Sequence, residues 1–595
     1  MSIHIESQEW MMTAGLIGFT RLLDEQVKMT RSGVEITADT IQDVASKYIY
    51  GLIDEFSVVE REMKRLNRCL SQMRKKPAEI KKHTADMLER IKEQYKRIEK
   101  YFPETEQCAA IKTLMKQLKE VTTAEDVDKV EQIVKGYQQA ASTPMINEKL
   151  TLNYARTVIL TPLYGQTSIL QLSFNGNTKE HIKQIEKDFV TPAYLELQFY
   201  HHIQHTTDPQ LIIQFLSQHE AQYKPFKDWL KKIKKCTTVQ EIKQYLYEEV
   251  LPCSFIDELR ATQSYEEKMF SPLALSRIKA ANFYWDFDNK QPIPMSAVAR
   301  LVLFMIPFGM TFYKRKRGND TSYEIINFAS IIMSEQSFPA IYKDNTHYKT
   351  LRSSGASFPE AIIGVLEESL DKAKKMNNAC TIIEVHSQYP GKKTLLDYYH
   401  VPPYLTSYLA KYGKGITLLH QYDLRDTFLR EILQGIDPKQ VLFQYLREAV
   451  KNDQHGQGAY HAVRERRRIL NARKDVKQMT SYDKRITFIK NCGVKLRKKM
   501  VSRPGNEGEG TYRASGRKKL EGVAYRLINA VKSGNKNGFM DTIFRLYMSA
   551  DMEIPDIFVD VFKDEGLDFE TIASAFIAGM LEKDTTKKEE ETANG

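Results

Sequence analysis

Most of the chain places its apolar residues at the three- and four-residue spacing of amphipathic helices. The stripe of Met87, Ile91, Tyr95 and Ile98 is an example, within a stretch from 51 to about 141 whose polar positions interleave both signs of charge. This pattern is typical of antiparallel helices with one buried and one solvated face. We predict a helical insertion over 51–141, in which Met and aromatic residues serve packing rather than chemistry.

The same spacing marks both ends of the chain. Trp10–Leu23 predicts a buried helix, and at the other end Leu520–Val531, Phe539–Tyr547 and Phe569–Leu581 predict further helices. A polar tail, 582–595, lacks the apolar residues that a packed core needs and is predicted to be disordered.

Between the two ends, shorter sequence patterns predict turns, helix caps and strands. Gly33 opens a predicted hairpin to Ile36, and Asp39 is placed to cap a helix from Thr40. Asn175–Asn177 predicts a turn with left-handed backbone. Strands are predicted at 157–160, 301–313, 323–332 and 381–386, with a basic hairpin tip at 314–320 joining the second to the third.

Together these elements predict an α+β fold that is predominantly helical. We expect a mixed α/β body over 1–450, carrying the insertion, followed by a helical bundle over 451–581. Gly456 and Gly458 predict a flexible linker before the bundle, and the Gly-rich stretch 502–515 predicts another within it.

The predicted C-terminal bundle carries a concentrated positive charge. The segment Leu446–Leu520 contains 21 Lys+Arg and 7 Asp+Glu, a balance of +14, whereas the full 595-residue chain nets +11. Its basic residues form four clusters: Arg464, Arg466, Arg467 and Arg468; Arg473, Lys474 and Lys477; Lys495, Arg497, Lys498 and Lys499; Arg517, Lys518 and Lys519.

Repeated positive charges at helical spacing suit a phosphate backbone, because neutralising phosphates releases counterions. We interpret these residues as candidate nucleic-acid ligands. The alternative is a solvated charged face with a flexible linker, which charge runs often form.

Catalytic and metal-binding motifs are weak. The six cysteines show no C-x-x-C spacing, and neither Gly-x-Ser-x-Gly nor a His-Asp doublet occurs. His201 and His205 share a helical face, but His202 stands where a zincin has its Glu. The run 389–394 lacks the first glycine of a phosphate loop. We expect no metal and no cofactor.

The N-terminus has no basic region followed by an apolar core, as a signal peptide would. The most apolar window, 297–313, is interrupted by Arg300, Pro307 and Gly309 and is shorter than the roughly 20 residues of a membrane helix. We expect a cytoplasmic protein without a membrane partner.

Several segments carry a resemblance to one family. Trp10–Leu23 resembles an opening W-x-x-x-A-G-I-x-G-F-x-R-L-L, and the end of the chain is the most telling part. The further segments are Leu160–Leu170, Leu303–Phe312, Ala524–Ala530, Arg545–Ser549, Ile554–Pro555 and Ala575–Gly579. Together they resemble the large subunit of type I-B CRISPR Cascade, in its Cst-type branch. Some members carry clustered cysteines as a zinc module, which this chain lacks.

The resemblance implies a non-catalytic subunit of an RNA-guided surveillance complex. Its implied partners are the backbone subunits around the guide RNA, target duplex DNA with its displaced strand, a small subunit and a separate helicase-nuclease. It implies that the protein recognises the protospacer-adjacent motif (PAM) and assists R-loop formation. It also implies that the C-terminal bundle resembles the small subunit, so that a fragment starting near Met479 could serve as one.

Two loops of the body are candidates for reading the motif, since Lys and Asn side chains suit acceptors on base edges. Ordinary turns are the alternative for both. The candidate residues are Lys314, Arg315, Lys316, Arg317, Asn319, Asn175 and Asn177.

Two other function classes stay open from the sequence. One is a metal-dependent nucleic-acid-processing enzyme whose acidic residues converge only in the fold. The other is a general RNA-binding scaffold.

Overall fold

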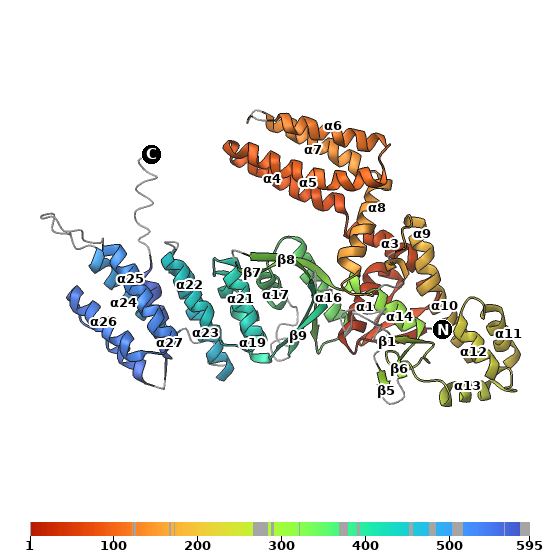
Figure 1. The fold of residues 1–595 in the computed structure, drawn as a ribbon. Helices are drawn as coiled ribbons and strands as arrows, with labels where there is room; N and C mark the ends of the chain where they lie inside the picture. Colours follow the sequence, from red (N-terminus) through yellow and green to blue (C-terminus); the bar gives the residue numbers. More distant parts are fainter. Residues whose placement is uncertain are drawn as a thin grey trace. The chain divides into compact units, whose positions relative to one another are not determined.

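The structure is a computed structural model. It describes residues 2–121, 123, 126–165, 168–171, 173–265, 284–286, 291–319, 322–367, 379–388, 393–451, 456–474, 483–501, 516–563 and 566–582. The fold is α+β and predominantly helical, as predicted (Figure 1). Internal contacts divide the chain into unit 1 (1–331, 337–342 and 384–397) and unit 2 (332–336, 343–383 and 398–595).

Unit 1 begins with a small sheet of order β1-β3-β2 and a buried helix. Its elements are β1 (Ser2–Glu6), α1 (Trp10–Leu23), β2 (Lys28–Met29), β3 (Gly33–Thr37), α2 (Ala38–Ile41) and α3 (Val44–Glu55). The α1 helix and the β2–β3 hairpin confirm the predictions. However, Thr37 rather than Asp39 caps α2, through a capping box with Thr40.

The α1 helix packs closely against α14 (Ala297–Phe304) and α15 (Ile306–Gly309). A Cβ on Gly18 would lie 2.0 Å from the Met305 carbonyl oxygen, and one on Gly309 would lie 1.8 Å from that of Ala14. The strand predicted over 301–313 is therefore wrong in its first part. A short continuous apolar run has the same pattern in a buried helix as in a buried strand.

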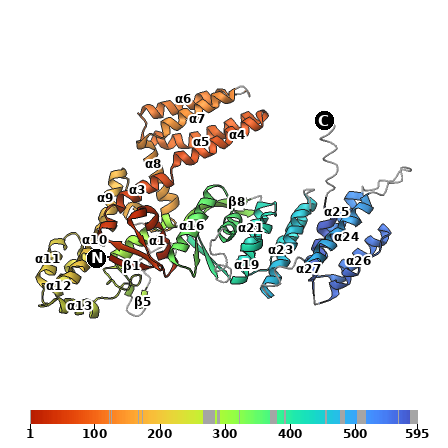
Figure 2. The same ribbon diagram turned by 180° about the vertical axis from the view of Figure 1, so that it is seen from behind.

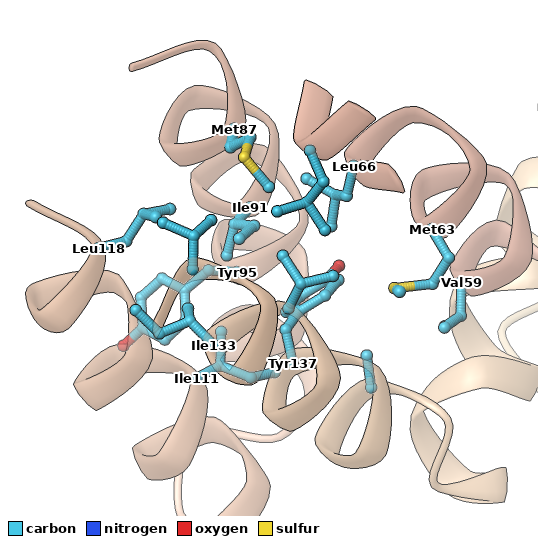
Figure 3. Close-up of a cluster of buried hydrophobic side chains, with 14 of the residues drawn as sticks. Val59, Met63, Leu66, Met87, Ile91, Tyr95, Ile111, Leu118, Ile133 and Tyr137 are labelled. Carbon is cyan, nitrogen blue, oxygen red and sulfur yellow. The ribbon is translucent and has the colours of Figure 1, made fainter. Parts of the chain in front are cut away.

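The helical insertion consists of α4 (Val58–Lys75), α5 (Ile80–Tyr101), α6 (Glu106–Glu120) and α7 (Val127–Ala141). Each of these helices packs against the next, and α4 also packs against α7. Met87, Ile91 and Tyr95 point into their shared core together with Leu66 and Tyr137 (Figure 3). This confirms the predicted helices and the packing role of their Met and aromatic residues.

Helices continue through α8 (Pro144–Tyr154), α9 (Thr178–Ile185), α10 (Thr191–His205), α11 (Pro209–His219), α12 (Lys224–Ile233) and α13 (Val239–Glu248). Residues 155–160 extend α8 as a π-helix, so the predicted strand at 157–160 is wrong. A β-branched run has only a weak preference for strands, which packing overrides here.

A buried carboxylate, Glu196 on α10, holds the start of α14. It accepts hydrogen bonds from Ala297 N at 2.9 Å and Val298 N at 3.2 Å, and from the hydroxyl groups of Tyr223 and Thr262. Burial raises the pKa of Glu196 to about 7, although these donors lower it.

We expect this group to make folding depend on pH. Between about pH 5 and 7 the unfolded chain loses the Glu196 proton while the folded chain keeps it, so stability falls as pH rises. Relative to Glu196→Gln, wild-type protein should lose up to about 1.4 kcal/mol per pH unit in that window. Urea unfolding of both proteins at pH 5, 6, 7 and 8 measures the difference; parallel curves would contradict the assignment.

Two further sheets follow. One has the order β4-β6-β5, with β4 (Gln263–Tyr265), β5 (Tyr284–Asp286) and β6 (Gln291–Met295). The other has the order β10-β9-β8-β7, and its residues are divided between the two units. Its strands are β7 (Thr311–Asn319), β8 (Ser322–Ser334), β9 (Cys380–Gln388) and β10 (Lys393–Val401). Strand β8 confirms the strand predicted at 323–332, and β9 confirms that at 381–386, whereas β10 was missed.

The predicted basic tip at 314–320 is wrong. Residues through Asn319 belong to β7, which pairs with β8 from Thr311 opposite Ser330 to Asn319 opposite Ser322. One basic residue of this strand, Arg315, meets a buried acceptor, Glu384, across the sheet.

Unit 2 is helical beyond its share of that sheet. Its helices are α17 (Phe358–Glu367), α19 (Pro403–Tyr412), α20 (Lys414–Thr417), α21 (Tyr422–Leu433), α22 (Lys439–Lys451), α23 (Gln457–Lys474), α24 (Lys484–Val501), α25 (Gly516–Lys532), α26 (Lys536–Ala550) and α27 (Phe569–Met580). A 3₁₀-helix, Asp556–Phe562, precedes α27, and α16 (Phe338–Ser353) contributes residues to both units.

Helix α27 lies at the centre of the C-terminal helices, against α22, α23, α24 and α25 (Figure 2). Gly456 does not form the predicted linker. Its N–H bonds to the Leu581 carbonyl, and a Cβ there would lie 2.2 Å from the Ala578 carbonyl oxygen. These glycines permit close packing rather than flexibility. The second predicted linker, 502–515, lies outside the described residues.

Contacts also run across the predicted boundary at 450. Helix α22, which precedes it, packs against α23, α25 and α27, which follow it.

Candidate nucleic-acid interface

The first basic cluster lies on α23, where Arg466 is buried with a side-chain exposure of 4%. Its guanidinium pairs with both carboxylate oxygens of Asp437, and donates to Asp568 at 2.8 Å and to Thr571 at 3.0 Å. Burial opposes its charge, but the two carboxylates outweigh burial and raise the pKa of Arg466. Arg466 therefore ties α23 to the loop before α22 and to the start of α27.

Its neighbours are also engaged. Arg464 and Arg468 donate to the fully buried carboxylate of Glu465, which also accepts from the Tyr408 hydroxyl at 2.8 Å. Arg467 donates to the Gly566 carbonyl at 2.8 Å. All four arginines are therefore engaged within unit 2, and their binding to phosphate stays a prediction. A net charge counted along a segment does not show which charges are already paired.

The remaining predicted cations lie at several kinds of position. Arg473 and Lys474 are exposed at the end of α23, Lys495, Lys498 and Lys499 are exposed on α24, and Arg497 donates to the Met580 carbonyl. Lys477 lies outside the described residues, as do the side chains of Arg517, Lys518 and Lys519 on α25.

Helix α24 has two contrasting faces. Its buried face contains Ile486, Ile489 and Leu496, and it approaches α27 through paired glycines. A Cβ on Gly493 would lie 2.2 Å from the Phe576 carbonyl oxygen, and one on Gly579 would lie 2.0 Å from that of Lys490.

The opposite face contains Lys484, Phe488, Asn491, Lys495 and Lys499, which are all exposed and follow one another at intervals of three or four residues. We call these residues the α24 stripe. Within the described part of the chain, no ion pair or side-chain hydrogen bond engages its three lysines.

Phe488 is the unexpected member of this stripe. Its exposed fraction is 49%, whereas the neighbouring Ile486 and Ile489 are buried. An exposed aromatic ring between lysines can stack on a base while the lysines meet phosphates. The seven-residue interval from Phe488 to Lys495 could have revealed this face.

The candidates for motif reading on β7 differ in exposure and in their contacts within the protein. Lys314 is exposed on β7, whereas Arg315 lies 3.6 Å from the buried Glu384 and covers the Phe328 ring at 4.0 Å. Lys316, Arg317 and Asn319 belong to β7, and their side chains lie outside the described residues.

Both asparagine candidates serve the fold. Asn177 caps α9 in a capping box with Glu180, and its φ of −81° is not left-handed. Asn175 accepts from Lys149 at 2.9 Å. The Asn-x-x-Glu spacing from 177 to 180 is the sequence signal of such a cap.

Titratable side chains gather most clearly on the sheet of β7 to β10. The Tyr313 hydroxyl donates to Glu384, and His386 lies 3.7 Å from Asp397. Each of these side chains therefore has a partner on the same sheet: Tyr313 with Glu384, and His386 with Asp397. His201 and His205 stack at 4.3 Å on α10. Among the described residues, no three His, Cys, Asp or Glu side chains are grouped to bind a metal ion.

No protein-family model, curated protein or solved structure matches this chain. None of the helices in the described ranges combines the length and apolar character needed to cross a membrane.

Proposed function

We propose that this chain is a non-catalytic, nucleic-acid-binding subunit of an RNA-guided CRISPR surveillance complex, and that its α24 stripe holds a phosphate backbone. The observation that carries the proposal is the stripe itself: three exposed lysines and an exposed aromatic ring follow one face of a helix whose other face is buried. Non-specific single-strand binding combines these two elements.

The type of complex rests on the resemblance to type I-B Cascade large subunits. In this proposal, guide pairing reads the target sequence, and the chain binds backbones and reads the short adjacent motif. Lys314 is the described candidate left for motif reading, since it is exposed at a strand position. The partners are the backbone subunits around the guide RNA, a small subunit and the helicase-nuclease.

The α24 stripe can be tested by salt dependence. Changing Lys484, Lys495 and Lys499 to Gln should lower the slope of log affinity against log salt by about two for single-stranded DNA, since each lost phosphate contact contributes about 0.7. Fluorescence anisotropy with a labelled 20-nucleotide strand at 50–200 mM salt measures the slope. Phe488→Ala should instead weaken binding by about 1–3 kcal/mol and leave the slope unchanged.

The matched control changes Lys112, Lys116 and Lys119 of α6 to Gln. This removes the same charge from another exposed helical stripe, which lies between Glu106 and Glu120. The control should retain the wild-type slope. If both triple variants change the slope equally, the binding reflects net charge alone and the stripe has no special role.

A further inference from the structure

A second dense run of positive charge lies outside the bundle. Residues 224–235 contain six lysines and a single acid, Asp228. This net +5 over twelve residues exceeds the density of the 446–520 segment, which nets +14 over 75 residues. The segment is α12 with the two residues that follow it, within unit 1.

Lysines occupy one side of this helix. Lys224, Lys227, Lys231 and Lys234 follow one another at intervals of three, four and three residues, and all are exposed. We call these four residues the α12 lysine face. At 100° per residue, they lie within an arc of about 80°.

The opposite side of α12 is buried in protein. Phe226, Trp229, Leu230 and Ile233 line it, and the Phe226 and Trp229 rings lie 5.6 and 5.1 Å from the ring of Phe199 on α10. Helices α11, α12 and α13 lie side by side in both views (Figures 1 and 2). No apolar side of α12 is left to enter a lipid surface, as a membrane-binding helix requires.

The stability of α12 accounts for only part of this face, since the helix dipole favours Lys231 in the last turn. Lys224 and Lys227 occupy its first turn, where the helix dipole disfavours cations, and the first turn contains no acid. Exposed helices that merely meet water interleave charges of both signs. Here Lys231 pairs with Asp228 and Lys232 with Glu249, whereas Lys224, Lys227 and Lys234 have no partner among the described residues.

The local field is strongly positive. The pKa of Asp228 is lowered by its hydrogen bond to Lys231, with Lys224 and Lys227 contributing. On the adjacent α13, Tyr247 is 75% exposed and the Arg260 guanidinium covers its ring at 5.0 Å. An exposed ring on a helix that packs against α12 can stack on a base.

We propose that the α12 lysine face is a second nucleic-acid-binding surface, which holds the phosphates of one strand. From Lys224 to Lys234 the face spans about 15 Å at 1.5 Å per residue. This length matches roughly four to five nucleotides of one strand at 3.4 Å each. Lysine suits the task because it binds phosphate as a point charge without selecting sequence. The surface belongs to unit 1 and does not depend on the α24 stripe.

The test changes Lys224, Lys227 and Lys234 to Gln in the full chain. We expect at least a tenfold loss of affinity for a labelled 20-mer at about 100 mM salt, and a salt slope lower by about two for a single strand or nearly three for a duplex. Changing the same lysines to Arg keeps the charge and should keep the slope. The Lys112, Lys116 and Lys119 variant is again the matched control.

Two further probes separate the possible partners: vesicles of phosphatidylcholine and phosphatidylserine at 7:3, and poly-glutamate. If the triple Gln variant loses only vesicle or poly-glutamate binding, or binds DNA like wild type, the inference is overturned. Running the α24 variant alongside separates the two claims. If the α24 variant alone loses slope, only the α12 surface fails; if the α12 variant alone loses slope, only the α24 stripe fails.

Discussion

Replacing Arg466 with alanine is expected to destabilise unit 2 by about 3–5 kcal/mol, the usual effect of breaking a buried ion pair by removing one partner. Its side chain is 4% exposed and reaches Asp437 and Asp568 together. The alanine variant leaves both carboxylates with fewer donors in a partly buried site. Because domains are stable by only about 5–15 kcal/mol in total, such a loss is large.

Guanidinium chloride unfolding, followed by circular dichroism, measures this effect. Arg473→Ala is the matched control, because Arg473 lies on the same helix but is exposed. It should change stability by less than about 0.5 kcal/mol. A double-mutant cycle with Asp568→Ala isolates the pair. If Arg466→Ala and Arg473→Ala have equal effects, the buried network does not stabilise the unit.

The same network changes how binding data should be interpreted. A variant lacking Arg466, Arg467 and Arg468 tests folding as well as binding, since all three are engaged within unit 2. Its loss of DNA binding would not identify a phosphate contact. The exposed lysines of the α24 stripe and of the α12 lysine face avoid this difficulty, since their removal leaves buried groups unchanged.

Local patterns predicted the helices well. The stripes of α5, α25 and α26 repeat over several turns, and such repetition leaves little doubt between helix and strand. Short apolar runs were less informative. Residues 297–309 form two buried helices, and 157–160 continue a helix, although both contain β-branched residues. Packing against α1 accompanies the two helices of 297–309, and this packing involves residues far apart in the chain.

Three of the segments that carry the family resemblance, 10–23, 160–170 and 303–312, lie in unit 1 and meet in its core. Tyr164 donates to the Leu303 carbonyl at 2.9 Å, and the Phe304 ring stacks on Tyr48 at 4.6 Å. Gly18 and Gly309 let α1 and α15 meet. In this unit these segments therefore specify packing, and the resemblance they carry is a resemblance of the core rather than of a binding surface.

The binding surfaces were harder to predict because a charge count does not show pairing. Arg466 finds Asp437 and Asp568, 29 and 102 positions away in the chain. The α12 lysine face could have been found from charge density, and Pro225 near the start of its helix is a start signal.

A fragment comprising residues 479–595 is expected to fold poorly, which argues against a small subunit that starts near Met479. It lacks α23, which packs against α27 and α22. The α23 helix buries Val463 and Ile469 and supplies Arg466. Each buried aliphatic side chain contributes about 1.5–3 kcal/mol, so losing α23 removes a large part of the stability of a domain of this size.

A fragment starting at Ile436 keeps Asp437, α22 and α23, and should unfold cooperatively in urea with a helical circular dichroism spectrum. Comparing the two fragments under the same conditions tests the boundary. Equal stability of the two fragments would show that α23 is dispensable. It would support a small subunit that starts near Met479. If only the longer fragment folds, a free small subunit made from this chain must begin before α23, because α27 needs that helix to bury its apolar side chains.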